Sequence, residues 1–229
     1  MSTDQGPDLR PSYLQHRAMR VDAARLTDLV AAAQPSDADR LVSLAAWYTR
    51  FEQAIHDHHT AEEAVVYPAL LERDPSFAAA HAELEGQHRV LADRLVVVRE
   101  SLNGLPAASG EPGWERERTE AAAAAQALRE IVTTHLDQEE DVAFSRYRWA
   151  FTAAEFAALG ATAWKLVGAR ALVFAGPWVL DHADPAERAQ LLADQPLLLR
   201  VLHRLVLQPR FDRLARPLRD ATTSPATQV

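Results

Sequence analysis

One short pattern occurs at two well-separated places in this chain: a histidine followed four residues later by a glutamate. The first copy is His58 with Glu62, and the second is His135 with Glu139. Residues four apart lie above one another on one face of an α-helix, so each pair directs an imidazole nitrogen and a carboxylate oxygen at one point. The pattern therefore predicts two helices that face each other across a shared polar site.

Helix-capping residues and helix breakers divide the first 150 residues into four long helices. Pro11 is a good first-turn residue, and Asp74-Pro75 combines an N-cap with a proline at the first helical position. The predicted helices cover residues 11–33, 39–72, 75–103 and 114–149, with a bend at Pro68 and a loop over 104–113. Four such helices with short connections predict an all-α, up-down-up-down four-helix bundle. We expect the bundle over residues 10–150, a helical extension over 151–219 and a disordered tail over 220–229.

The paired histidines lie on apolar helix faces. His58 has Ile55 three residues before it and Val65 seven after it, and His135 has Leu128 seven before it. This spacing indicates the face of each helix that is turned toward the core. Buried ionisable groups are costly unless they are paired or bind a metal, so these positions favour a metal site.

The arrangement resembles the hemerythrin-like (HHE cation-binding) family, whose members hold a non-haem di-iron centre in a four-helix bundle. The family pattern has a lone histidine on the first and third helices, and a histidine–carboxylate pair on the second and fourth. A tail of two glutamates, apolar residues and an aromatic residue follows both pairs here, and the resemblance covers roughly residues 10 to 150. The ligands that it implies are His16, His58, Glu62, His88, His135 and Glu139.

The mixture of imidazole and carboxylate ligands, with no sulfur, favours a bridged pair of Fe ions over one tetrahedral Zn, with Mn as an alternative. The chain contains no cysteine, which excludes iron–sulfur clusters and thiolate zinc sites. We expect Glu62 and Glu139 to bridge the two ions, together with an oxide or hydroxide from solvent. Coordination positions left open on iron are where dioxygen or hydrogen peroxide can bind.

Two other pairs compete for places in the site. His59 and Glu63 repeat the four-residue spacing one position later, about 100° around the helix, so only one register is expected to face the core. The matching tails favour His58 with Glu62. His81 and Glu85 lie near the face of His88, where either is a candidate for a further ligand or for a partner that orients a ligand.

The resemblance implies an oxidoreductase that reacts with dioxygen or peroxide, either decomposing peroxide or oxidising an organic or deazaflavin-type reductant. The alternative is a protein that senses or stores oxygen, nitric oxide or iron without turnover. The oxygen-carrying members place two histidines four apart on the third helix, whereas Leu84 stands four residues before His88. The missing histidine argues against reversible oxygen carriage and favours the oxidoreductase.

Composition limits the other partners. A net charge of −8 and a pI of about 5.6 argue against general nucleic-acid binding. No apolar run is long enough to span a membrane, and the polar N-terminus shows no secretory signal, so a cytoplasmic location is expected.

The metal pattern stops near residue 150, and three further helix signals follow. Thr152 to Glu155 is a capping box, Asp184 caps another helix, and residues 197–207 predict one more. Six arginines make this end basic, and His182 and His203 are not expected to be ligands. The extension is expected to pack across the bundle; a lid over the site, a homodimer surface and a peripheral membrane contact are the other hypotheses.

Overall fold

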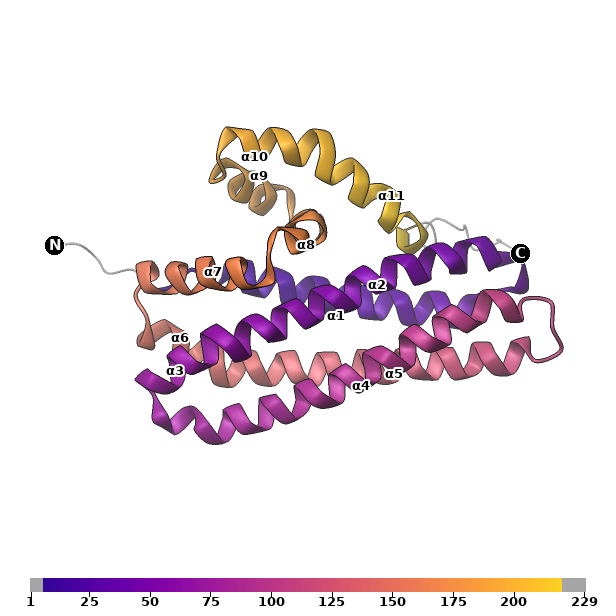
Figure 1. Ribbon diagram of the computed structural model, residues 1–229, viewed down its shortest axis with the longest axis horizontal. Coiled ribbons are helices and arrows are strands. Elements are labelled where there is room, and N and C mark those ends of the chain that lie inside the picture. The colour runs from indigo at the N-terminus through magenta and orange to yellow at the C-terminus, as the bar shows by residue number, and fades with distance from the viewer. Residues whose placement is uncertain (1–5, 220–229) are drawn as a thin grey trace, which may run out of the picture.

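The computed structural model describes residues 6–219, which form helices with no strand among them. Four long helices lie side by side as a bundle (Figure 1): α1 (Arg10–Ala32), α2 (Ala38–Ala61), α4 (Ala78–Ala108) and α5 (Trp114–Glu139). The prediction of an all-α helical bundle is confirmed. The tail predicted over residues 220–229 lies outside the described residues.

Two of the four helices continue through a short π-helical segment. The segment η2 (Glu62–Val66) joins α2 to α3 (Tyr67–Arg73), and η4 (Glu140–Phe144) joins α5 to α6 (Ser145–Ala150). Pro68 lies in the first turn of α3. The 3₁₀ turn η1 (Pro35–Asp37) connects α1 to α2, and η3 (Pro75–Phe77) connects α3 to α4.

The predicted loop over residues 104–113 begins too early, because α4 continues to Ala108. Leu105 is almost completely buried in the core, and its burial outweighs the helix-breaking tendency of Gly104 and Pro106. Pro106 lies in the last turn, where its carbonyl accepts a hydrogen bond from the Ser109 amide. Packing of the helix end therefore shortens the loop to residues 109–113.

The apolar core has two parts along the bundle. The larger part contains Trp47, Phe51 and Leu128, and the smaller part, at the α3–α6 end, contains Phe77 and Tyr147. α2 and α5 contribute apolar residues to the larger part, and the segments that continue them, η2–α3 and η4–α6, contribute to the smaller part. The polar site therefore lies between two dry cores.

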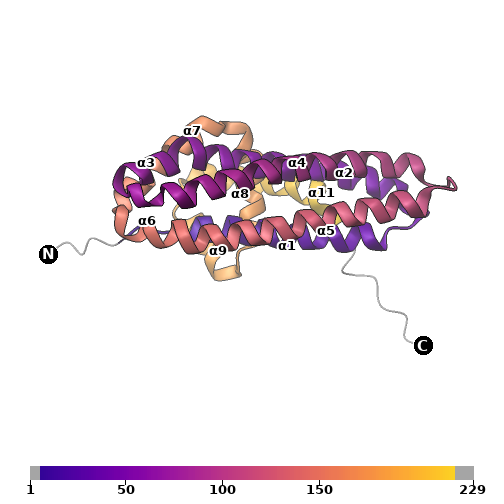
Figure 2. The same ribbon diagram turned by 90° about the horizontal axis from the view of Figure 1, so that it is seen from below.

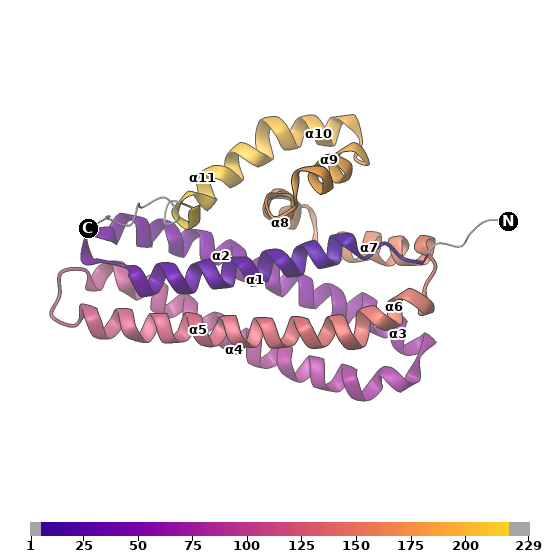
Figure 3. The ribbon, with the colours of Figure 1, turned by 180° about the vertical axis from the view of Figure 1, so that it is seen from behind.

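The C-terminal extension covers one side of the bundle. Its elements are α7 (Ala153–Val167), α8 (Ala169–Asp181), α9 (Pro185–Ala193), α10 (Leu197–Leu202), η5 (His203–Leu207) and α11 (Gln208–Arg219). In the bundle α1 packs on α5, α5 on α4 and α4 on α2, while α8 and α11 each contact both α1 and α2. The extension thus packs along the remaining α1–α2 side. The helices α9 and α10, together with η5, form an arch that rises away from this side (Figures 1 and 3). The helix predicted over 197–207 continues without a break to Arg219.

A buried carboxylate fixes the extension to α1. Asp22 accepts hydrogen bonds from the indole of Trp178 at 2.8 Å, the imidazole of His182 at 3.0 Å and the guanidinium of Arg25 at 3.1 Å. Because Asp22 is 1% exposed, removing its donors would leave a buried charge without partners. His182 therefore helps to hold the extension against α1.

Candidate metal centre

Seven side chains from four helices converge on the polar site between the two cores. Their ligand atoms form two groups, within each of which the atoms lie no more than 4.8 Å apart. One group is His16, His58, Glu62 and Glu139, and the other is His59, Glu62, His88 and His135. The structure thus brings together all six sequence-predicted ligands and adds His59. Figure 2 shows the bundle that contains them from below.

The two carboxylates lie between the imidazoles. Glu62 has one oxygen 2.9 Å from Nε2 of His58 and the other 3.6 Å from Nε2 of His88. Because it belongs to both groups, Glu62 has the position of a bridging ligand. Glu139 belongs to the first group, with Oε2 at 3.4 Å from Nε2 of His16, and the same oxygen is 3.9 Å from Nε2 of His135.

The inward-facing atoms of the site are buried and lack hydrogen bonds. One oxygen of Glu62, both oxygens of Glu139 and Nε2 of four histidines make no hydrogen bond of acceptable geometry, although other ligand atoms lie as near as the 2.9 Å between His58 and Glu62; the histidines are His16, His58, His88 and His135. Buried polar atoms are almost always satisfied in folded proteins. A cluster of orphaned nitrogen and oxygen atoms that point at common centres fits a pair of cations, whose bonds would satisfy them.

The second glutamate of each doublet orients a histidine on another helix. Glu63 lies 2.7 Å from Nδ1 of His88, and Glu140 lies 2.9 Å from Nδ1 of His16. A carboxylate beside Nδ1 holds the proton there and leaves the Nε2 lone pair free to bind a metal. Glu63 therefore acts on a ligand and does not join the ligand groups itself.

His135 is oriented in the same way by an amide. The side-chain oxygen of Gln87 lies 3.0 Å from Nδ1 of His135, and Gln87 in turn donates to Gln138 at 2.6 Å. Nothing in the sequence singles out Gln87, because its partner is remote in the chain. Only the packing of α4 against α5 brings the two side chains together.

The π-helical segments place an aromatic ring beside each of the two histidines that the glutamate doublets orient. In a π-helix the backbone hydrogen bonds span five residues, so the residue five positions after a glutamate lies near it on the same face. Tyr67 follows Glu62 by five and stacks on His88, with ring centroids 6.2 Å apart. Phe144 follows Glu139 by five and packs on His16 at 5.0 Å. The aromatic residue in each repeated tail thus covers the histidine that the doublet orients.

The expectation that only one histidine register faces the core is wrong. His58 and His59 both lie in the site but face different neighbours: the ring of His58 is 5.1 Å from that of His16, and the ring of His59 is 3.9 Å from that of His88. A site wide enough for two centres accepts side chains that diverge by about 100°. The position that corresponds to His59 on α5 is Leu136, so the two groups differ in their number of imidazoles.

Two further sequence candidates lie outside both ligand groups. His81 packs against the rings of Tyr67 and Phe77 at 5.5 and 6.0 Å. Glu85 forms an ion pair with Arg89 at 3.1 Å on the exposed face of α4. The structure therefore assigns packing to His81 and a surface ion pair to Glu85.

Burial sets the protonation of the site in the absence of a metal. It lowers the pKa of His58 and His135, the latter to about 2, so both imidazoles are neutral near pH 7. Burial also raises the pKa of Glu62 and of Glu139 to about 8, and the proximity of Glu62 adds to the increase for Glu139. Neutral imidazoles and carboxyls that have given up their protons are the forms that bind metals, so cations would take the place of protons here.

Two buried tyrosine hydroxyls lie beside the carboxylates. Burial raises the pKa of Tyr67 and Tyr147 well above its ordinary value, and the nearby Glu139 and Glu62 raise it further. Among the described residues the hydroxyl of Tyr147 has no hydrogen-bond partner, and the hydroxyl of Tyr67 is directed at the carboxylates of Glu62 and Glu139. Both phenols are therefore protonated donors at the edge of the site.

Comparison with known proteins agrees with this geometry. The hemerythrin HHE cation-binding domain matches residues 13–147, which include all seven side chains of the two ligand groups. Neither a curated protein nor a solved structure gave a match. Because the family match covers more than half of the 229 residues, the chain belongs to the hemerythrin family of cation-binding domains.

Proposed function

We propose that this hemerythrin-family bundle holds two iron ions bridged by Glu62 and is an oxidoreductase that reacts with dioxygen or hydrogen peroxide. The observation that carries the proposal is the combination of two adjoining ligand groups with two buried tyrosine hydroxyls beside their carboxylates. The ligand groups support the metal part of the proposal, and the hydroxyls support the binding of a small oxygen-containing ligand beside the metal.

The donor set favours iron over zinc. Five imidazoles and two carboxylates, shared between two centres, are too many for one tetrahedral zinc and include no thiolate. Iron bound there would supply redox chemistry and coordination positions that the protein leaves open. The same ligands suit manganese, so metal analysis is the first step of any test.

The protein residues shape the space that a small ligand would enter. Tyr67 and Tyr147 each offer a hydroxyl proton near the carboxylates, where a hydrogen bond to a ligand oxygen would hold it in place. Phe77 and Phe144, both buried, help to close the α3–α6 end to water. A dry cavity strengthens such hydrogen bonds, because no solvent competes for the donors.

A second function, ligand binding or sensing without turnover, is favoured by one observation. Leu84 stands where the oxygen carriers have a histidine, but His59 of the neighbouring helix brings an additional imidazole to His88 and His135. A centre with this fuller ligand set has fewer open positions for reactants. Turnover measurements distinguish the two functions.

The test begins with the protein isolated aerobically from iron-replete cells. We expect about two iron ions per chain, one for each ligand group, and near-ultraviolet absorption from an oxygen bridge. Peroxide decay or oxygen consumption with a supplied reductant would then support the oxidoreductase. Stoichiometric zinc without iron would refute the di-iron site, and two irons without turnover would favour the sensor.

A further inference from the structure

The arch of the extension exposes apolar side chains that a water-facing helix rarely carries. Leu198 and Leu205 are 78% and 68% exposed, and Leu202 is also exposed. Their spacing of four and three residues places them on one side of the α10–η5 helix. None of the residues of α10 or η5 is buried, so the stripe contributes nothing to the core. An apolar stripe without a partner indicates a binding surface.

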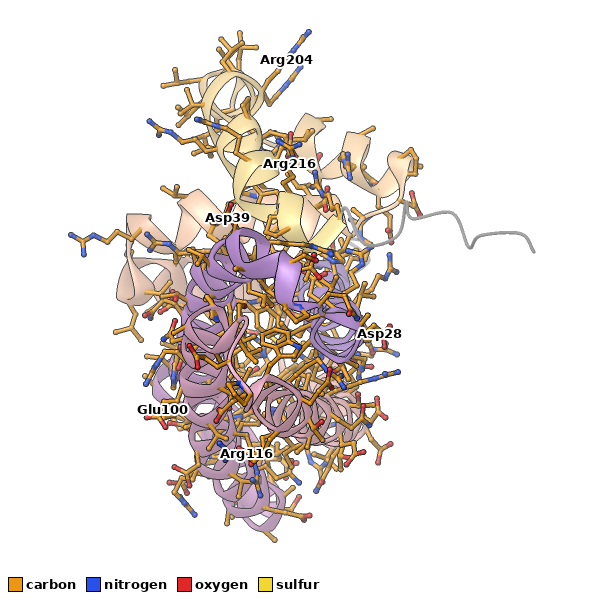
Figure 4. The ribbon with its side chains drawn as sticks, turned by 90° about the vertical axis from the view of Figure 1, so that its right-hand side faces the viewer. Asp28, Asp39, Glu100, Arg116, Arg204 and Arg216 are labelled. Atoms are coloured by element: carbon orange, nitrogen blue, oxygen red, sulfur yellow. The ribbon has the colours of Figure 1, made fainter. Side chains whose placement is uncertain are left out.

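The same segment concentrates positive charge. Residues 197–219 contain six arginines and one aspartate, a net charge of +5, whereas residues 1–151 contain 15 arginines and 25 acidic residues, a net charge of −10. Figure 4 shows Arg204 at the outer end of the arch and Arg216 nearer the bundle. Two of the six arginines, Arg200 and Arg204, lie on α10–η5 and the other four on α11, so the positive charge follows the C-terminal helix from the arch down to the bundle.

Two arginines of the arch are left without partners. Arg200 and Arg204 have no side-chain hydrogen bond or ion pair among residues 6–219, whereas Arg219 pairs with Asp181 at 2.7 Å and with Asp212 at 2.9 Å. Both unpaired arginines line an open cleft of about 780 Å³ beneath α10, together with His203 and Arg188. Asp181 and Asp212 also line the cleft and both pair with Arg219, so Arg188, Arg200 and Arg204 leave a net positive charge that can receive an anionic group.

We propose that the arch is a peripheral binding surface for a bilayer that contains anionic lipids. The leucine stripe would enter the interface between headgroups and acyl chains, and Arg200 and Arg204 would contact lipid phosphates. A basic amphipathic helix is the form that lies in such an interface. The acidic bundle would be repelled by the same surface, which turns the arch toward the membrane. None of the described helices combines the length and apolar composition needed to cross a bilayer, so the contact is peripheral.

A second copy of the chain fits this surface less well. In a two-fold contact each residue lies near its own equivalent, which would bring the arginines of the two arches together. The stripe is confined to one short helix, whereas a stable dimer buries about 800 Å² on each partner. Anionic lipids provide both the negative charge and the apolar depth that a second arch lacks.

The test is flotation of the full-length, metal-loaded protein with vesicles. We expect binding to vesicles of equal parts phosphatidylglycerol and phosphatidylcholine, and none to phosphatidylcholine alone. At about 1 M salt, where the screening length falls to about 3 Å, binding should be largely lost. Equal binding to both vesicle types, or no binding to either, would overturn the proposal.

Two sets of variants locate the surface. R200Q/R204Q should weaken binding about thirtyfold, since each arginine near an anionic surface contributes about 1 kcal/mol. L198S/L202S/L205S should weaken it at least about tenfold through the lost apolar burial. The matched controls change exposed residues of the bundle, R50Q/R94Q for charge and V42S/V90S/V97S for apolar area, and should bind as the wild type does.

Solution mass distinguishes the competing occupant. Light scattering without lipid should give a monomer for both the wild type and the leucine variant. A wild-type dimer that dissociates in the leucine variant would assign the stripe to a second copy and overturn the lipid proposal. Lipid binding that is unaffected by both arch variants would also overturn it.

Discussion

The bundle and the C-terminal extension place their ionisable residues in opposite ways. The bundle buries its functional histidines and glutamates between two apolar cores, and the described side chains of α7, α9 and α10 include no buried residue at all. The cost of burying these polar groups in the bundle can be offset, because their ligand atoms lie close enough together for one cation to bond to several of them. In the arch, arginines and leucines stay exposed and depend on something outside the chain.

The bundle and the extension each contribute to the packing of the other. The bundle supplies the extension with its anchor, Asp22, and the extension supplies the α1–α2 side with Phe174 and Trp178. Asp22 lies six residues after His16 on α1, so the anchor and the ligand share one helix. Changes at the metal site should nevertheless leave the anchor intact, because the two make no common hydrogen bond.

The largest effect is expected when the shared carboxylate is changed. Glu62→Gln should abolish binding of both ions, because Glu62 belongs to both ligand groups. The apo protein should keep its stability, since burial raises the pKa of Glu62 to about 8 and glutamine mimics the protonated form. Metal content and thermal unfolding with and without metal measure the two parts. Glu85→Gln, on the exposed face of α4, is the matched control, and equal metal loss in both variants would contradict the assignment.

Removing His59 should have the next largest effect. His59→Leu copies Leu136, the residue at the corresponding position of α5, and should weaken the ion held with His88 and His135 while the other remains. We expect metal content near one per chain under mild chelation. His81→Leu should keep both ions, because His81 packs against aromatic rings outside the groups. A His59→Leu protein that retains both ions as firmly as the wild type would remove His59 from the site.

Breaking the anchor should separate the two regions without emptying the site. Asp22→Ala leaves the buried indole N–H of Trp178 without an acceptor, at a cost of about 1–3 kcal/mol. Hydrogen exchange of α8 should accelerate while the metal content stays at the wild-type value. Arg17 forms an ion pair with Glu187 at 3.0 Å but is largely exposed, so Arg17→Gln should change exchange little. Loss of metal in Asp22→Ala would show that the regions are coupled more tightly than their contacts indicate.

The smallest effect concerns pH. Burial opposes protonation of His182, but the hydrogen bond and charge of Asp22 outweigh it and raise its pKa above the ordinary 6.5. A raised folded-state pKa means that the added stability is fully present below pH 6.5 and is lost as the pH rises through the folded-state pKa. Exchange of α8 amides, corrected for intrinsic rates, should therefore increase modestly on the alkaline side. His182→Gln should remove this dependence, and an opposite slope in the wild type would refute it.

Spacing alone predicted the two histidine–glutamate pairs, because residues four apart lie on one face of a helix, whereas His16 and His88 were implied only by the family resemblance. A histidine and a glutamate four apart on an apolar stripe can share a target only on a helix, and two copies define the facing pair. His59 was mistaken for a competitor because the one-dimensional pattern does not reveal how wide the site is. The sequence also did not show that Glu62 and Glu63 have different roles, because the partner of Glu63 is His88 on another helix.

The remaining errors arise where packing overrides local preference. Gly104 and Pro106 are poor helix residues, and only the burial of Leu105 against the core keeps α4 intact there. In the extension, the capping box at Thr152 and the cap at Asp184 both start helices as predicted. The position of α8 over α1 and α2 depends on the hydrogen bond between Asp22 and Trp178, residues far apart in the chain that carry no local signal.

The two glutamate doublets have a consequence for how the protein matures. Helices α1 and α2 with η2 belong to the first half of the bundle sequence, and α4 and α5 with η4 to the second. Glu63 of the first half orients His88 of the second, and Glu140 of the second half orients His16 of the first. Each half of the bundle thus orients a ligand of the other half through a carboxylate, whereas His135 is oriented within its own half by the amide of Gln87. A nascent chain that contains only the first half would lack the carboxylate that orients His16. Tight metal binding is therefore expected only after both halves have been synthesised and have packed together.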